Sequence, residues 1–181
     1  APLGAKRSYW QANRREPAVG DFNGDGKDDV LLRSLDETSE VVMLLGASTG
    51  FAAPIDLTTI PWMSASKWSA KYRALVVVDI NGDGRDDVVL PSKAPVHATY
   101  KLIADGTGKF LPEQDVNFEY WMDWGSWTTQ HGKHVGGDFD GDGLGDLFIQ
   151  GLTEYHGSRL LYGNAQGGFD RRVVVSDASP F

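Results

Sequence analysis

The chain has 181 residues, no cysteine and a formal net charge of −8. This length can bury a substantial core in one or two domains, but without cysteine no disulfide can stabilise it. The acidic balance argues against nucleic acid as a partner, because phosphate binding needs clustered Lys and Arg. No apolar run approaches the roughly 18 residues of a membrane-spanning helix, so membrane insertion is not expected.

The first patterned segment follows Trp10 and is centred on the acidic, glycine-rich stretch Asp21–Asp29. Short runs rich in Val, Leu, Ile and Phe surround this stretch, and a Gly50-Phe51 turn separates the last two. Such runs, bounded by Gly, Asp, Asn and Pro, predict β-strands. The predicted strands cover residues 18–20, 30–32, 41–45 and 52–57.

The same order of elements occurs twice more, with the first loop residue at Asp79 and then at Asp138, 58 and 59 positions further on. Each loop is preceded at the same distance by a tryptophan and followed by a Gly-Phe turn. The tryptophans are Trp10, Trp68 and Trp127. The corresponding strands are predicted over 73–79, 88–90, 99–103 and 111–118, and over 135–137, 147–149, 158–162 and 171–176.

Four short strands per repeat and no segment with a capped helical period predict an all-β protein. The repeats cover residues 9–57, 68–118 and 127–177, within a single domain spanning 1–181. Repeated four-stranded antiparallel sheets are typical of β-propeller blades. One such blade cannot cover both of its faces, so neighbouring blades must stack on it. The connections over 58–67 and 119–126 are predicted to be surface loops.

The three acidic loops place oxygen-bearing side chains at loop positions 1, 3, 5 and 9, with glycine at position 6 and a carbonyl available at position 7. This spacing suits Ca²⁺, which takes several oxygen ligands. The alternative is an Asp/Gly-rich turn without metal, but its carboxylates would repel one another. An EF-hand would need Glu at position 12, where this chain has Leu32, Leu90 and Ile149.

The motif Asp-x-(Asp/Asn)-x-Asp-Gly-x-x-Asp between strands, with a Gly-Phe turn about thirty residues later, resembles the FG-GAP/VCBS repeat of integrin-α-like propellers. The resemblance implies three Ca²⁺ sites. Their side-chain ligands would be Asp21, Asn23, Asp25 and Asp29; Asp79, Asn81, Asp83 and Asp87; and Asp138, Asp140, Asp142 and Asp146. The carbonyl ligands would come from Lys27, Arg85 and Leu144, with Asp28 and Asp86 at position 8 secondary.

Propellers of this family usually close with six or seven blades, and three blades leave two faces open. We therefore expect the ring to be completed by a second copy, as a homodimer, or by further blades of a longer chain.

Two groups of aromatic residues are candidates for packing or for ligand binding. The repeated tryptophans are interpreted as packing residues between blades. The unrepeated aromatics in the long connections could stack on a sugar or contact a protein, or be buried by their own loops. They are Trp62, Tyr120, Trp121 and Trp124. His131 and His134 lack a third ligand for a second metal site.

The expected function is a calcium-stabilised binding module, secreted or at the cell surface, that recognises a glycan or a protein. The alternative is a non-binding structural segment of a larger secreted or toxin-like protein. A hydrolase is the weakest hypothesis, because the clustered carboxylates are assigned to metal and no nucleophile elbow or phosphate-binding loop is present. We therefore do not expect an enzyme.

Overall fold

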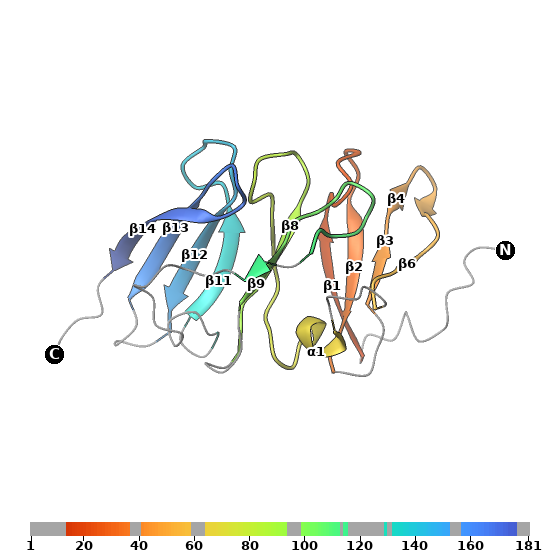
Figure 1. Cartoon of the computed structure of the whole chain (residues 1–181), viewed down its shortest axis with the longest axis horizontal. Helices are drawn as coiled ribbons and strands as arrows, with labels where there is room; N and C mark the ends of the chain where they lie inside the picture. The colour runs from red at the N-terminus through yellow and green to blue at the C-terminus, as the bar shows by residue number, and fades with distance from the viewer. Residues whose placement is uncertain are drawn as a thin grey trace.

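The described residues of the computed structural model are 14–36, 41–58, 64–93, 99–112, 114–115, 129, 132–152 and 157–176. They form three four-stranded antiparallel sheets and one two-stranded hairpin. Figure 1 shows the three sheets side by side in chain order. The predicted all-β fold of antiparallel four-stranded units is thus confirmed for this part of the chain. No helix in it is long and apolar enough to cross a membrane.

Sheet 1 holds its strands in the order β1-β2-β3-β6. These strands are β1 (Arg15–Gly20), β2 (Asp29–Ser34), β3 (Val42–Leu44) and β6 (Ile55–Asp56). Between β3 and β6, the strands β4 (Gly46–Ala47) and β5 (Gly50–Phe51) pair as the small hairpin. This hairpin is the turn that the sequence predicts at Gly50-Phe51, and Gly50 has the positive φ of 97° that a tight turn favours.

Sheets 2 and 3 repeat this arrangement. Sheet 2 contains β7 (Val76–Val78), β8 (Asp87–Leu90), β9 (Tyr100–Leu102) and β10 (Gln114–Asp115). Sheet 3 contains β11 (Gly132–Gly137), β12 (Asp146–Gly151), β13 (Ser158–Gly163) and β14 (Phe169–Ser176). The sequence does not predict the single helical turn α1 (Ala65–Trp68), which lies in the connection between sheets 1 and 2.

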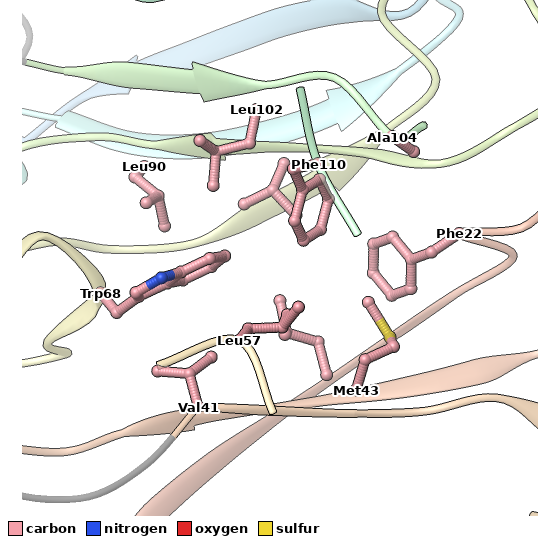
Figure 2. Packing of buried hydrophobic residues seen from close by; sticks show 11 residues of the cluster. Phe22, Val41, Met43, Leu57, Trp68, Leu90, Leu102, Ala104 and Phe110 are labelled. Carbon is pink, nitrogen blue, oxygen red and sulfur yellow. The ribbon is translucent and has the colours of Figure 1, made fainter. Parts of the chain in front are cut away.

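The largest buried cluster lies between sheets 1 and 2 (Figure 2). Trp68, at the end of α1, is fully buried, and its ring centroid lies 5.8 Å from that of Phe110. Phe110 also contacts Phe22 edge-on, with centroids 5.9 Å apart. The interpretation of Trp68 as a packing residue between sheets is therefore confirmed. Trp10 and Trp127 lie outside the described residues.

A second cluster fills the space between sheets 2 and 3, where Val78, Val89 and Ile80 meet Leu147 and Leu161. Alternate residues of β8 take part in different clusters: Val88 and Leu90 face sheet 1, whereas Val89 faces sheet 3. This period of two places one sheet against neighbours on both faces.

Sheet 3 presents an apolar row on the face away from sheet 2, which we call the open face. Its residues are paired in register across the four strands: Val135, Phe148, Leu160 and Val173. Val135 is 52% exposed and Val173 is 39% exposed. The outward face of sheet 1 is more covered, because Leu32, Val42 and Leu44 are buried there, although Val19 beside them is 55% exposed. Among the described sheets, sheet 3 thus presents the more exposed apolar face.

Candidate calcium loops

The three acidic loops lie at the same edge of the molecule, each joining the first strand of a sheet to the second (Figure 1). We call them loop 1 (Asp21–Asp29), loop 2 (Asp79–Asp87) and loop 3 (Asp138–Asp146). The hairpins are continuous with the strand registers, since Gly20 pairs with Asp29 and Gly137 with Asp146. Each loop is therefore held at both ends by a paired strand.

The first aspartate organises its loop by accepting backbone hydrogen bonds. One carboxylate oxygen of Asp21 accepts from the N–H groups of Gly24 and Asp25, at 2.8 and 3.1 Å, and the other accepts from Gly26 at 2.8 Å. Asp79 and Asp138 accept the same three hydrogen bonds in their loops. The glycine at position 6 has positive φ in all three, for example 79° at Gly26, which favours glycine there.

The ninth residue of each loop is a buried aspartate that joins the loop to a residue at the end of the third strand of its sheet or two positions beyond it. The two carboxylate oxygens of Asp29 accept hydrogen bonds from the N–H groups of Phe22, at 3.0 Å, and Gly46, at 2.7 Å. Asp87 and Asp146 repeat the pattern with donors at the same sequence spacing. A carboxylate here therefore fixes the hairpin whether or not it also binds a cation.

Burial raises the pKa values of two of these aspartates, Asp29 and Asp87. Desolvation raises the pKa of Asp87 to about 7, although two backbone N–H donors oppose the shift, and the nearby charges of Asp83 and Asp79 raise it further. Desolvation likewise raises the pKa of Asp29. A divalent cation among the loop oxygens would favour the ionised form of these groups, as any close positive charge does.

Loop 3 brings three of the predicted ligands together. Oxygens of Asp138, Asp140 and Asp146 all lie within 4.8 Å of one another. Incomplete hydration, followed by repulsion from Asp142 and Asp146, raises the pKa of Asp140. Several carboxylate oxygens converging on one point fit a hard cation that takes only oxygen ligands. At position 3, where loop 3 has Asp140, loops 1 and 2 carry Asn23 and Asn81. In those two loops an amide oxygen therefore replaces one charged carboxylate.

The aspartate at position 5 has a different hydrogen-bonding partner in loop 3 than in loops 1 and 2. The carboxylate of Asp25 accepts a hydrogen bond from the Lys27 ammonium at 2.9 Å, which lowers the pKa of Asp25. Asp83 pairs in the same way with the Arg85 guanidinium. Loop 3 has Leu144 at position 7, where loops 1 and 2 have a basic residue. Asp142 therefore has no basic partner there and accepts the backbone N–H of Leu144, at 2.8 Å. The position-5 acids of loops 1 and 2 are thus partly neutralised by their own loops.

The sequence did not reveal that successive loops are hydrogen-bonded to one another. The N–H of Asp86 donates to the carbonyl of Asp21 at 2.9 Å, and the carboxylate of Asp86 accepts from the N–H of Asp21 at 2.8 Å. In the next junction, the N–H of Gly145 donates to the carbonyl of Asp79 at 2.6 Å. Position 8 carries an acid in two loops, but no sequence signal shows that its partner lies in the preceding sheet.

The predicted ligand-binding aromatics are not placed by the structure. Trp62, Tyr120, Trp121 and Trp124 all lie outside the described residues. Their role therefore stays a prediction.

Comparison with known families supports the repeat interpretation. Residues 19–90 match the family model described as an FG-GAP-like repeat, which confirms the resemblance over loops 1 and 2. No curated protein matches the chain.

Among solved structures, the chain is similar to a lectin from Agrocybe aegerita that is described as specifically recognising non-reducing terminal N-acetylglucosamine. The TM-score is 0.66 at 21% sequence identity, over 93% of this chain and 39% of the lectin chain. At this identity the likeness concerns the fold alone. This chain spans about two fifths of the length of the lectin.

Proposed function

Because residues 19–90 match the model of an FG-GAP-like repeat, we propose that this chain is a calcium-stabilised, non-enzymatic binding module that recognises a glycan or a protein. The observation that carries the proposal is the convergence of carboxylate oxygens from Asp138, Asp140 and Asp146 in loop 3. The same backbone geometry recurs in loops 1 and 2.

Each loop would hold one Ca²⁺ through its side-chain oxygens at positions 1, 3, 5 and 9 and the carbonyl at position 7. A bound Ca²⁺ supplies positive charge that offsets the repulsion among these carboxylates and couples folding to metal. The first aspartate orients the loop amides, and the ninth joins the loop to the segment that follows the third strand, as at Gly46. In loops 1 and 2, the basic residue at position 7 pairs with one oxygen of the position-5 carboxylate, so that this acid offers less negative charge to the ion.

Thermal melting with and without a chelator tests this proposal. Extracellular Ca²⁺ modules bind at roughly 10⁻⁴–10⁻³ M, so three sites in 10 mM Ca²⁺ should raise the melting temperature by on the order of 10 °C. Mg²⁺ at the same concentration is the control, because its smaller, octahedral coordination suits these loops less well. An unchanged melt in Ca²⁺ would sink the calcium proposal.

An affinity in this range would suit a location outside the cytosol. Sites of this strength fill only where free Ca²⁺ is near 10⁻³ M, as it is in secreted and cell-surface settings. Secretion or surface display is therefore part of the proposal.

Carbohydrate recognition is proposed from the fold, which resembles that of a lectin. The candidate contact residues are the loop aromatics Trp62, Tyr120, Trp121 and Trp124, because an aromatic face can stack on a sugar ring. A glycan array that includes terminal N-acetylglucosamine, probed with the parent protein and with Trp121→Ala, tests this part. Binding that Trp121→Ala weakens supports it; Trp68→Phe is a matched control in the packed core.

The alternative is a structural segment without a ligand of its own. It is favoured by the coverage, since this chain corresponds to 39% of the lectin chain and a whole propeller would contain further sheets. A calcium-dependent, folded protein that binds nothing on protein and glycan arrays would favour this alternative.

The open face of sheet 3 supports completion of the ring by additional sheets. Phe148 occupies the place that Val89 holds in sheet 2, and Val89 is fully buried against sheet 3. We propose that this face is covered in the complete assembly, by a second copy or by further blades of a longer chain. Sedimentation of this chain distinguishes the two: a dimer indicates a second copy, whereas a monomer leaves further blades as the occupant.

A further inference from the structure

The junction between loops 1 and 2 is built differently from the junction between loops 2 and 3. The carboxylate of Asp86 accepts the N–H of Asp21, and the N–H of Asp86 donates to the carbonyl of the same residue. In the second junction position 8 is Gly145, so only the backbone hydrogen bond to Asp79 is made. The backbone of one predicted ligand residue is thus held at both of its polar groups by the neighbouring loop.

The position-7 residue of each following loop also lies against the loop before it. A Cβ added to Gly24 would lie 3.0 Å from Cγ of Arg85, and one added to Gly82 would lie 2.7 Å from Cδ2 of Leu144. Both glycines have positive φ, 75° and 70°. The residue whose carbonyl is a predicted ligand in one loop therefore packs directly on position 4 of the previous loop.

Through these contacts, the conformation of one loop restrains the conformation of the loop before it. Asp21 organises loop 1 by accepting three backbone hydrogen bonds within it. Its own backbone is fixed by Asp86, which precedes the ninth residue of loop 2. Ordering of loop 2 by a cation would therefore also restrain Asp21, so that less conformational entropy is lost when loop 1 takes its own ion.

We propose that Asp86 is a positioning residue that couples loops 1 and 2, so that Ca²⁺ in either loop raises the affinity of the other. This inference rests on the proposed calcium binding. Coupling is reciprocal, and it is stronger between loops 1 and 2 than between loops 2 and 3, where Gly145 has no side chain. The two loop pairs of one chain thus provide an internal comparison.

The experiment is a Ca²⁺ titration by calorimetry in a background where one loop is silenced. Asp138→Ala leaves the pair of loops 1 and 2, and Asp21→Ala leaves the pair of loops 2 and 3. The first pair should bind with a Hill coefficient clearly above 1, and the second with a coefficient closer to 1. Typical couplings change affinity about 5-fold or more.

Variants of Asp86 in the Asp138→Ala background show whether Asp86 acts by accepting the hydrogen bond from Asp21 or by its negative charge. Asp86→Gly copies the second junction and should remove the cooperativity, raising the Ca²⁺ concentration at half saturation roughly 2-fold for a coupling of about 5-fold. Asp86→Asn keeps an acceptor for the N–H of Asp21 and should keep the cooperativity. The matched control is Asp28→Gly, which removes the same side chain from position 8 of loop 1, where no preceding loop is bonded to it among the described residues.

The outcomes distinguish this inference from the proposed function. No heat of Ca²⁺ binding in the parent protein would overturn the calcium proposal itself. Three bound ions with no cooperativity between loops 1 and 2, or equal loss of cooperativity in Asp86→Gly and Asp28→Gly, would overturn the coupling while the calcium sites stand.

Discussion

Val89 of sheet 2 and Phe148 of sheet 3 occupy the same position of the repeat, yet Val89 is fully buried and Phe148 only partly. Sheet 2 has a neighbour on each face, whereas sheet 3 has a described neighbour on one. Equivalent side chains thus differ in burial because of what stacks on the sheet. In such an array, stability is gained mainly at the junctions between units.

The largest expected effect comes from the junction between sheets 1 and 2. Trp68→Ala should lower the free energy of unfolding by about 3–5 kcal/mol, because it leaves a cavity beside Phe110. Urea denaturation measures this value. A loss below about 1 kcal/mol would mean that packing between sheets 1 and 2 is not a main source of stability.

The second prediction concerns the close approach of loops 2 and 3. A Cβ on residue 145 would lie 2.4 Å from the carbonyl oxygen of Asp79, so Gly145→Ala should cost about 1–3 kcal/mol through a forced backbone shift. It should also weaken Ca²⁺ binding in loop 2. Gly143→Ala is the control, because its site has open space and its cost is limited to positive-φ strain of about 1–2 kcal/mol. If loop 2 of Gly145→Ala binds Ca²⁺ as tightly as in the parent protein, the close approach of loops 2 and 3 does not affect the loop 2 site.

The third prediction is a pH dependence that Ca²⁺ removes. The pKa of Asp87 is raised by burial from 3.8 to about 7 in the folded, metal-free protein. The folded state therefore holds this proton more tightly than the unfolded state. The contribution of Asp87 to the free energy of unfolding is complete below pH about 4 and is lost as the pH rises through about 7.

In chelator, the melting temperature should consequently fall between pH 5 and pH 8, and excess Ca²⁺ should flatten the curve. Asp87→Asn should reduce the slope in chelator, with Asp28→Asn as the exposed control at position 8. A melting temperature that rises over this range in chelator would show that Asp87 is not the dominant group.

The smallest effect is expected on the open face of sheet 3. Val173 is 39% exposed, so Val173→Ser should change the stability of an isolated chain by less than about 0.5 kcal/mol. If a second copy covers this face, the same variant should instead shift the sedimentation profile toward monomer. Both results are measured on one sample, by melting and by sedimentation.

The period of the repeat made much of the fold predictable. Leu31, Val89 and Phe148 each follow the first loop aspartate by ten positions, and each lies in the second strand of its sheet. The ranges predicted over 30–32, 88–90 and 147–149 all fall inside β2, β8 and β12. Strand ends were less accurate, since the range 52–57 contains only the two-residue strand β6.

The contacts between units could not be predicted in this way. The pairing of Asp86 with Asp21 spans 65 positions and depends on how two sheets stack. The helical turn at Ala65–Trp68 carries Trp68 into the core, and no helical period marks it in the sequence. In loop 3, three of the predicted ligands are brought together, at Asp138, Asp140 and Asp146.

The number of Ca²⁺ ions bound per chain tests the account most directly. Native mass spectrometry in millimolar Ca²⁺ should find three ions on the parent protein and two on Asp25→Ala, because each loop holds its ion with its own residues. A parent protein that binds no Ca²⁺, while melting at the same temperature with and without chelator, would contradict it.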